Sequence, residues 1–187
     1  MARAERLTAE DWLAAAYARF RTEGLPGVRI EAVARDLGAT KGSFYWHFAD
    51  RKALVIAVME RWEYEETDRF AEEADLEPDP RTRLETLFRS VGARRAPGED
   101  RLYISAVAEG VGDIVDRVTT RRVEYVAAGL VELGIEPDEA RRRAIAAVAI
   151  TLGLEQLRQG GAVAIFTDRA ELGRAVENLM FAAPPGQ

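Results

Sequence analysis

The sequence of 187 residues contains no cysteine and only one histidine, His47. Without cysteine, the chain can form no disulfide framework, no thiolate nucleophile and no cysteine-ligated zinc site. A single histidine also excludes a histidine-rich metal centre. We therefore expect neither a metal nor another cofactor, and the residues that carry function must be of other types.

Long apolar stretches are also missing. Residues 1–11 lack the apolar core of a signal peptide, and the longest apolar run, residues 144–154, is much shorter than the roughly 20 residues that span a bilayer. Runs of β-branched residues with a period of two are absent, so we expect no sheet. These absences predict a globular, all-helical, cytoplasmic protein with no membrane partner.

The net charge of −6 argues at first against a nucleic-acid partner. The charge is unevenly distributed, however. Residues 1–62 contain 10 Lys and Arg against 8 Asp and Glu, whereas residues 63–187 contain 16 against 24. The acidity therefore belongs to the C-terminal part, and the N-terminal part remains compatible with DNA.

Apolar side chains recur at helical spacing along most of the chain. Together with residues that favour helix ends, this pattern predicts nine helices and no strand. The expected helices run from Thr8 to Gly24, over 30–37, 41–45 and 50–73, from Pro80 to a turn near residue 94, over 102–111, 114–133 and 137–159, and from Asp168 through Met180. We expect residues 1–50 to form one domain and residues 51–187 a second, joined by the long uninterrupted helix over 50–73.

Residues 38–48, with the sequence GATKGSFYWHF, combine a lysine, two hydroxyl side chains, the histidine and four aromatic residues. A helix, a turn beginning at Gly38 and a short helix capped by Thr40 form the outline of a helix-turn-helix, whose second helix enters the DNA major groove. Lys41 and Tyr45 are four residues apart and so share one face, while Phe44 should point inward. On this pattern alone, a helical hairpin without a partner remains the alternative.

Residues 28–54, VRIEAVARDLGATKGSFYWHFADRKAL, closely resemble the DNA-binding region of the tetracycline-repressor (TetR) family. The resemblance implies that the groove-facing residues are Thr40, Lys41, Gly42 and Ser43. It also implies phosphate contacts by Tyr45, His47 and Arg51, with Lys52 as a neighbouring candidate. The family usually has a Thr or Ser at the start of the second helix, where this chain has Val28 and Arg29; Arg29 could supply the phosphate contact by its charge, but the helix loses a cap. For His47, a packing role remains equally open.

The C-terminal part would carry two further functions. Family members bind a small effector in a cavity among the central helices, and our candidates for its lining are Trp62, Phe70, Phe88, Tyr103, Arg122 and Tyr125. Glu109, Thr119 and Glu155 are further polar candidates, although each could equally be a surface charge, and each aromatic could be ordinary core. Small and apolar residues of the last two helices suggest a homodimer built as a four-helix bundle. The candidates for this interface are Ala144, Ala147, Gly153, Leu172, Val176, Leu179 and Met180, and packing inside one subunit is the alternative.

These observations predict a dimeric, ligand-responsive transcriptional regulator, most simply a repressor of palindromic operators that a small effector releases. An activator or a ligand-independent regulator of the same fold is the second hypothesis. A small helical enzyme is a remote third, because the sequence contains no nucleophile–base pair and no phosphate-binding loop.

Overall fold

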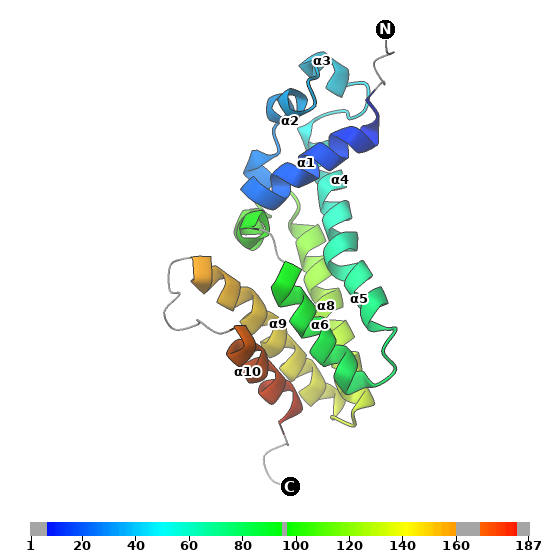
Figure 1. Ribbon diagram of the computed structural model, residues 1–187, viewed down its shortest axis with the longest axis vertical. Helices are drawn as coiled ribbons and strands as arrows, with labels where there is room; N and C mark the ends of the chain where they lie inside the picture. Colours follow the sequence, from blue (N-terminus) through cyan, green and yellow to red (C-terminus); the bar gives the residue numbers. More distant parts are fainter. Residues whose placement is uncertain (1–6, 95–96, 160–168, 183–187) are drawn as a thin grey trace. The chain divides into compact units, whose positions relative to one another are not determined.

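The computed structural model describes residues 7–94, 97–159 and 169–182. Within these ranges, the side chains left outside the description are those of residues 90–94, 97, 100, 154–156, 158, 159 and 169–173. The described residues are helical or lie in short connections, and they include no strand (Figure 1). The predicted all-helical class is confirmed.

Two compact units divide the chain. The N-terminal unit comprises residues 1–65 and 96–116, and the C-terminal unit comprises residues 66–95 and 117–187. Because the chain passes between the units more than once, no single cut in the sequence separates them.

The N-terminal unit begins with α1 (Ala9–Glu23), followed by the 3-10 helix η1 (Leu25–Gly27), α2 (Ile30–Asp36), α3 (Lys41–Phe44) and α4 (Arg51–Glu63). Thr8 and Asp11 cap the start of α1 reciprocally, and Thr8 is the residue at which the sequence predicts this helix to begin. The buried face of α1, which includes Trp12 and Phe20, packs against α4, which buries Leu54 and Val58. This packing fixes α1 and α4 as the support for the two shorter helices.

A second segment completes the N-terminal unit: η3 (Pro97–Arg101), α7 (Leu102–Ser105) and the first residues of α8 (Gly112–Glu132). The 3-10 helix η3 lies against the end of α1, and Gly98 makes this approach possible. A Cβ atom at residue 98 would lie only 1.8 Å from the carbonyl oxygen of Phe20. No larger residue fits there without moving the backbone.

The helix predicted over residues 50–73 is continuous but not regular. It starts as α4, widens into the π-helical segment η2 (Tyr64–Asp68) and continues as α5 (Arg69–Ala74). Within the C-terminal unit, Arg122 of α8 donates from Nη2 to the carbonyl oxygen of Glu66 (2.8 Å) and from Nε to Oγ1 of Thr67 (3.1 Å). A guanidinium that binds a main-chain carbonyl in this way stabilises a wide turn, where the regular i to i−4 ladder is interrupted.

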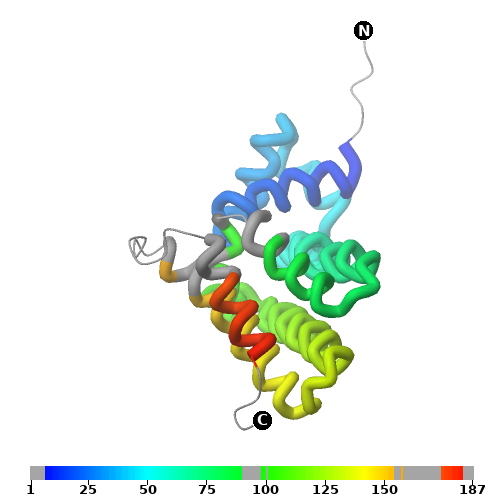
Figure 2. The backbone as a smooth tube through the Cα atoms, turned by 60° about the horizontal axis from the view of Figure 1, so that its bottom comes forward, coloured from blue at the N-terminus to red at the C-terminus, as the bar shows by residue number. Residues whose placement is uncertain are grey.

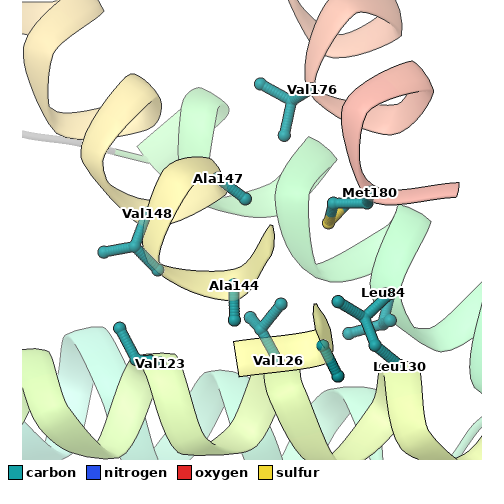
Figure 3. Close-up of a cluster of buried hydrophobic side chains, with 10 residues drawn as sticks. Leu84, Val123, Val126, Leu130, Ala144, Ala147, Val148, Val176 and Met180 are labelled. Carbon is teal, nitrogen blue, oxygen red and sulfur yellow. The ribbon is translucent and has the colours of Figure 1, made fainter. Parts of the chain in front are cut away.

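The C-terminal unit consists of α5, α6 (Pro80–Arg94), most of α8, α9 (Pro137–Gln159) and α10 (Arg169–Phe181). Its core joins Leu84 of α6 to Val126 and Leu130 of α8, with small and apolar side chains of α9 and α10 filling the space between (Figure 3). In the tube view, α10 runs beside α9 (Figure 2), consistent with the contacts between them.

This core corrects part of the predicted dimer interface. Ala144, Ala147, Val176 and Met180 are all at most 4% exposed and belong to the core of the unit itself. Side chains enclosed by their own subunit cannot contact a second one. Of the other candidates, Gly153 is half-buried, Leu179 is 37% exposed, and the side chain of Leu172 lies outside the described residues.

Candidate nucleic-acid interface

The turn between α2 and α3 has the geometry that the sequence predicts. Gly38 has a φ of +61°, a left-handed conformation that glycine adopts without strain, and the amide of Ala39 donates to the carbonyl of Ala34 (2.8 Å). Thr40 then caps α3 by accepting from the amide of Ser43 (3.3 Å). At the start of α2, Arg29 makes no side-chain capping bond, so the cap is missing as expected. The result is a helix-turn-helix.

Aromatic side chains support α3 from behind. Phe44 is completely buried; its ring meets the Trp12 ring edge-on at 5.4 Å between centroids and stacks with Phe48 at 5.7 Å. His47 is half-buried, with its ring 6.5 Å from that of Trp12. Four residues provide only about one helical turn, which is unstable by itself, so this packing holds α3 in place.

The opposite face of α3 is open to solvent. Thr40, Lys41, Gly42 and Tyr45 are exposed. Ser43 is half-buried, and its hydroxyl donates to the carbonyl of Thr40 (2.8 Å). Hydrogen-bond donors on a protruding helix are the groups that contact bases and phosphates in a major groove.

Trp46 follows directly after α3 and is 81% exposed, while Tyr45 is 54% exposed. A tryptophan can fill a core or lie at a surface, and the structure places Trp46 at the surface. Arg29 and Lys52 are also exposed. Tyr45 and Trp46 thus offer exposed aromatic area next to α3, and the N-terminal unit also exposes cationic side chains.

Lys41 does not stand alone on this face. Its Nζ lies 2.6 Å from Oε1 of Glu31, which projects from the first turn of α2. Hydrogen bonding to Lys41 lowers the pKa of Glu31, and the same bond raises the pKa of Lys41. Both groups are therefore charged at neutral pH. Glu31 could not be identified from the sequence pattern, because ten positions and a turn separate it from Lys41 and no helical spacing connects them.

Arg51 makes three contacts within the N-terminal unit. Its Nε donates to the carbonyl of Val28 (2.7 Å), its Nη2 to the carbonyl of Leu25 (2.8 Å), and its Nη1 to Glu109 (2.7 Å). These bonds brace the start of α4 against the chain near η1 and the segment before α8. The contact of Arg51 with a DNA phosphate remains a prediction.

The predicted effector-binding residues fall in both units. Trp62 and Tyr103 belong to the N-terminal unit, where Trp62 is buried and Tyr103 half-buried. In the C-terminal unit, Phe70 is buried and Phe88 packs at the edge of the core. These placements do not test the effector cavity, which remains a prediction.

Two polar candidates of that set have partners within the C-terminal unit. Besides the bonds of Arg122 to η2, the hydroxyl of Tyr125 donates to Asp75 (2.7 Å), and burial together with this bond raises the pKa of Tyr125. Tyr125 is thus neutral at physiological pH. Of the other polar candidates, Glu109 pairs with Arg51, Thr119 is half-buried, and the side chain of Glu155 lies outside the described residues.

Residues 13–58 match the family model described as bacterial regulatory proteins of the tetR family. Over these residues, the chain is similar to regulators of the TetR family. The matched residues run from α1 into α4 and include the whole helix-turn-helix, the element that reads DNA in proteins of this fold.

Solved structures extend the likeness to the whole TetR fold. The reduced form of NemR from E. coli superposes with a TM-score of 0.74 at 19% identity, covering 92% of this chain and 95% of that one. A putative TetR-family transcriptional regulator from Rhodococcus sp. has a TM-score of 0.69 at 22% identity, with 92% and 97% covered. BioQ, solved with its double-stranded DNA operator, has a TM-score of 0.57 at 22% identity, with 93% and 98% covered. No curated protein sequence matches the chain significantly.

Among the residues that the structure describes, no helix is long and apolar enough to cross a bilayer.

Proposed function

We propose that this chain is a dimeric repressor of the TetR family that binds palindromic operator DNA and is released from it by a small effector. In this proposal, residues 1–50 supply the DNA-binding region, and residues 51–187 supply effector binding and dimerisation. The observation that carries it is the solvent-facing side of α3, where Lys41 and Tyr45 are exposed while Phe44 behind them is buried. The similarity to TetR-family regulators favours a regulator over the small helical enzyme that composition alone allows.

Dimerisation follows from the size of the reading element. An α3 of four residues contacts only a few base pairs, too few to specify one site in a genome, whereas two copies about one helical turn of DNA apart read a palindrome. Helices α9 and α10 both expose apolar side chains suited to pairing with a second copy. They are Ile145, Ile150, Leu157 and Leu179, each between 37% and 49% exposed.

Release by an effector is a shift between two populations. A ligand that binds better to one conformation of the dimer favours it, and a conformation whose recognition helices do not match the two half-sites loses the avidity of the second contact. BioQ is a protein of similar fold that has been solved on its operator, which supports the DNA-binding part of the proposal.

Selection of bound duplexes from a random pool tests the proposal. We expect a palindromic winner, and we expect Lys41→Ala and Tyr45→Ala each to weaken its binding at least about tenfold in gel shifts. Arg89→Ala is the matched control, because it removes an exposed cation from the C-terminal unit and should leave affinity unchanged. Absence of preference for any duplex would reject DNA binding, and a non-palindromic winner would reject the dimeric mode.

Transcription from a promoter that contains the selected operator distinguishes repression from activation. We expect lower transcript levels with the protein present, and recovery when a compound from a metabolite panel releases it. Higher transcript levels would support the activator hypothesis, and an operator affinity that no compound alters would support a ligand-independent regulator.

A further inference from the structure

The ion pair between Glu31 and Lys41 lies on the surface that the proposed function directs towards DNA. Glu31 is 61% exposed and Lys41 is 53% exposed, with 2.6 Å between the carboxylate oxygen and the ammonium nitrogen. Ion pairs this exposed contribute little to folding, because water screens them and the side chains lose entropy. Folding stability therefore does not explain why Lys41, on the helix proposed to read DNA, is paired with the Glu31 carboxylate.

The position of the carboxylate is also unfavourable for simple backbone binding. A phosphate offers only acceptor oxygens and negative charge, so Glu31 repels it and competes with it for Lys41. A base-pair edge in the major groove is different, since it presents acceptors and a donor side by side. Guanine offers its N7 and O6 as acceptors, and the paired cytosine offers its N4 amino group as a donor.

We infer that Glu31 and Lys41 act together as a reader of one G·C base pair in each half-site. The Lys41 ammonium donates to guanine N7 and O6, while the Glu31 carboxylate accepts from the N4 amino group of the paired cytosine. The adjacent donor and acceptor of the protein thus match the adjacent acceptor and donor of the base pair. Glu31 is then a specificity-determining residue that disfavours contacts with phosphate alone.

Glu31 also lies beside Arg29, whose charge further lowers the pKa of this carboxyl group. A carboxylate with two neighbouring cations remains ionised, so its acceptor capacity is available in the groove. Arg29 can contact a phosphate at the same time, because the DNA backbone of the same half-site runs beside the base-pair edge that Glu31 and Lys41 contact.

The inference rests on the proposed DNA binding and is tested with the full-length protein. The probes are the selected operator, a set of operators each with one base pair substituted, and a random duplex of equal length. Wild type should discriminate against substitution of one G·C pair per half-site at least about fivefold. The Glu31→Gln protein should lose this discrimination at the G·C pair but keep its discrimination at the other positions. It should also bind the random duplex about five times more tightly than wild type does.

Asp36→Asn is the matched control. It also removes one negative charge and one ion pair from α2, because Asp36 pairs with Arg19 of α1 on the same unit. Asp36→Asn should leave the discrimination and the affinity for the random duplex unchanged. Equal effects of the two substitutions would show that only net charge matters and would overturn the inference.

A double-mutant cycle shows whether the two residues act as one reader. In a Lys41→Ala background, Glu31→Gln should no longer change the discrimination at the G·C position. The inference is overturned if Glu31→Gln has an undiminished effect in that background. It is also overturned if the single variant Glu31→Gln loses discrimination at an A·T position, or loses it at no position. If wild type prefers no duplex, the proposed function itself fails; if wild type discriminates and Glu31→Gln does so equally, only the inference fails.

Discussion

Arg51 shows how one planar side chain can join three segments of the N-terminal unit. Its guanidinium binds two carbonyl oxygens near η1 and the carboxylate of Glu109. Leu25 and Val28, which provide these carbonyls, are almost fully buried, so water cannot easily replace the lost donors. Lysine would keep the charge but could not reproduce three diverging hydrogen bonds.

We therefore expect Arg51→Lys to lower the free energy of unfolding by about 1–3 kcal/mol, measured by chemical denaturation. Lys52→Gln, at the exposed neighbouring position, should change it by less than about 0.5 kcal/mol. Unchanged stability of Arg51→Lys together with weaker operator binding would support the phosphate-contact role that the resemblance implied.

At the scale of elements, Arg143 determines how α10 ends. Its Nη1 donates to the carbonyl oxygens of Met180 (3.0 Å) and Ala182 (2.5 Å), while its Nε donates to Glu139 (2.7 Å). The carbonyl groups of a last helical turn have no partner within their own helix. A cation from α9 therefore supplies the missing donors and fixes α10 to α9.

Replacing Arg143 with Gln should destabilise the protein by about 2–4 kcal/mol, because the residue is only 7% exposed and its loss leaves polar groups unpaired. Arg142→Gln is a close control. Arg142 binds the same Glu139 (3.1 Å) but is mostly exposed, so its replacement should cost less than about 0.5 kcal/mol. Thermal unfolding of both variants measures the difference, and similar melting temperatures would contradict the capping role.

Helices and caps could be predicted from the sequence because they depend on neighbours within about four residues. Thr8, Thr40 and Gly38 each act as their local sequence indicates. The π-helical turn in η2 could not be predicted, since the side chain that binds it, Arg122, is more than fifty positions away. The partners of Lys41 and Arg51 also lie beyond local helical spacing, ten positions away for Glu31 and between 23 and 58 positions away for the partners of Arg51, so they could not be predicted either.

The misassigned interface residues illustrate a different limit. Ala144 and Ala147 are small and lie at helical spacing, which predicts close approach of another helix but does not identify that helix. In the structure, the core around them includes α6 and α8 of the same subunit. Apolar side chains such as Ile145 and Leu179 also lie on the exposed sides of α9 and α10, so the apolar pattern alone does not distinguish the two faces.

At the scale of the whole molecule, the proposed dimer makes a prediction about these outer sides. Ile145→Glu and Leu179→Glu should leave the helical content unchanged but yield monomers in sedimentation experiments, because each would bury a carboxylate at the interface. Operator affinity should fall by at least about 100-fold as the second half-site contact is lost.

Leu76→Glu provides the control for this prediction. Leu76 is 84% exposed in the same unit but lies in neither α9 nor α10. The Leu76→Glu protein should sediment as wild type does. If all three variants remain dimeric, the subunits associate through another surface.

The exposed Trp46 has a practical consequence. The other two tryptophans, Trp12 and Trp62, are at most 1% exposed. A charged quencher such as iodide in solution should therefore diminish only the emission of Trp46, which lies next to the recognition helix. The chain thus contains its own optical reporter of what covers that surface, and titration with unlabelled duplex can be followed without attaching a dye.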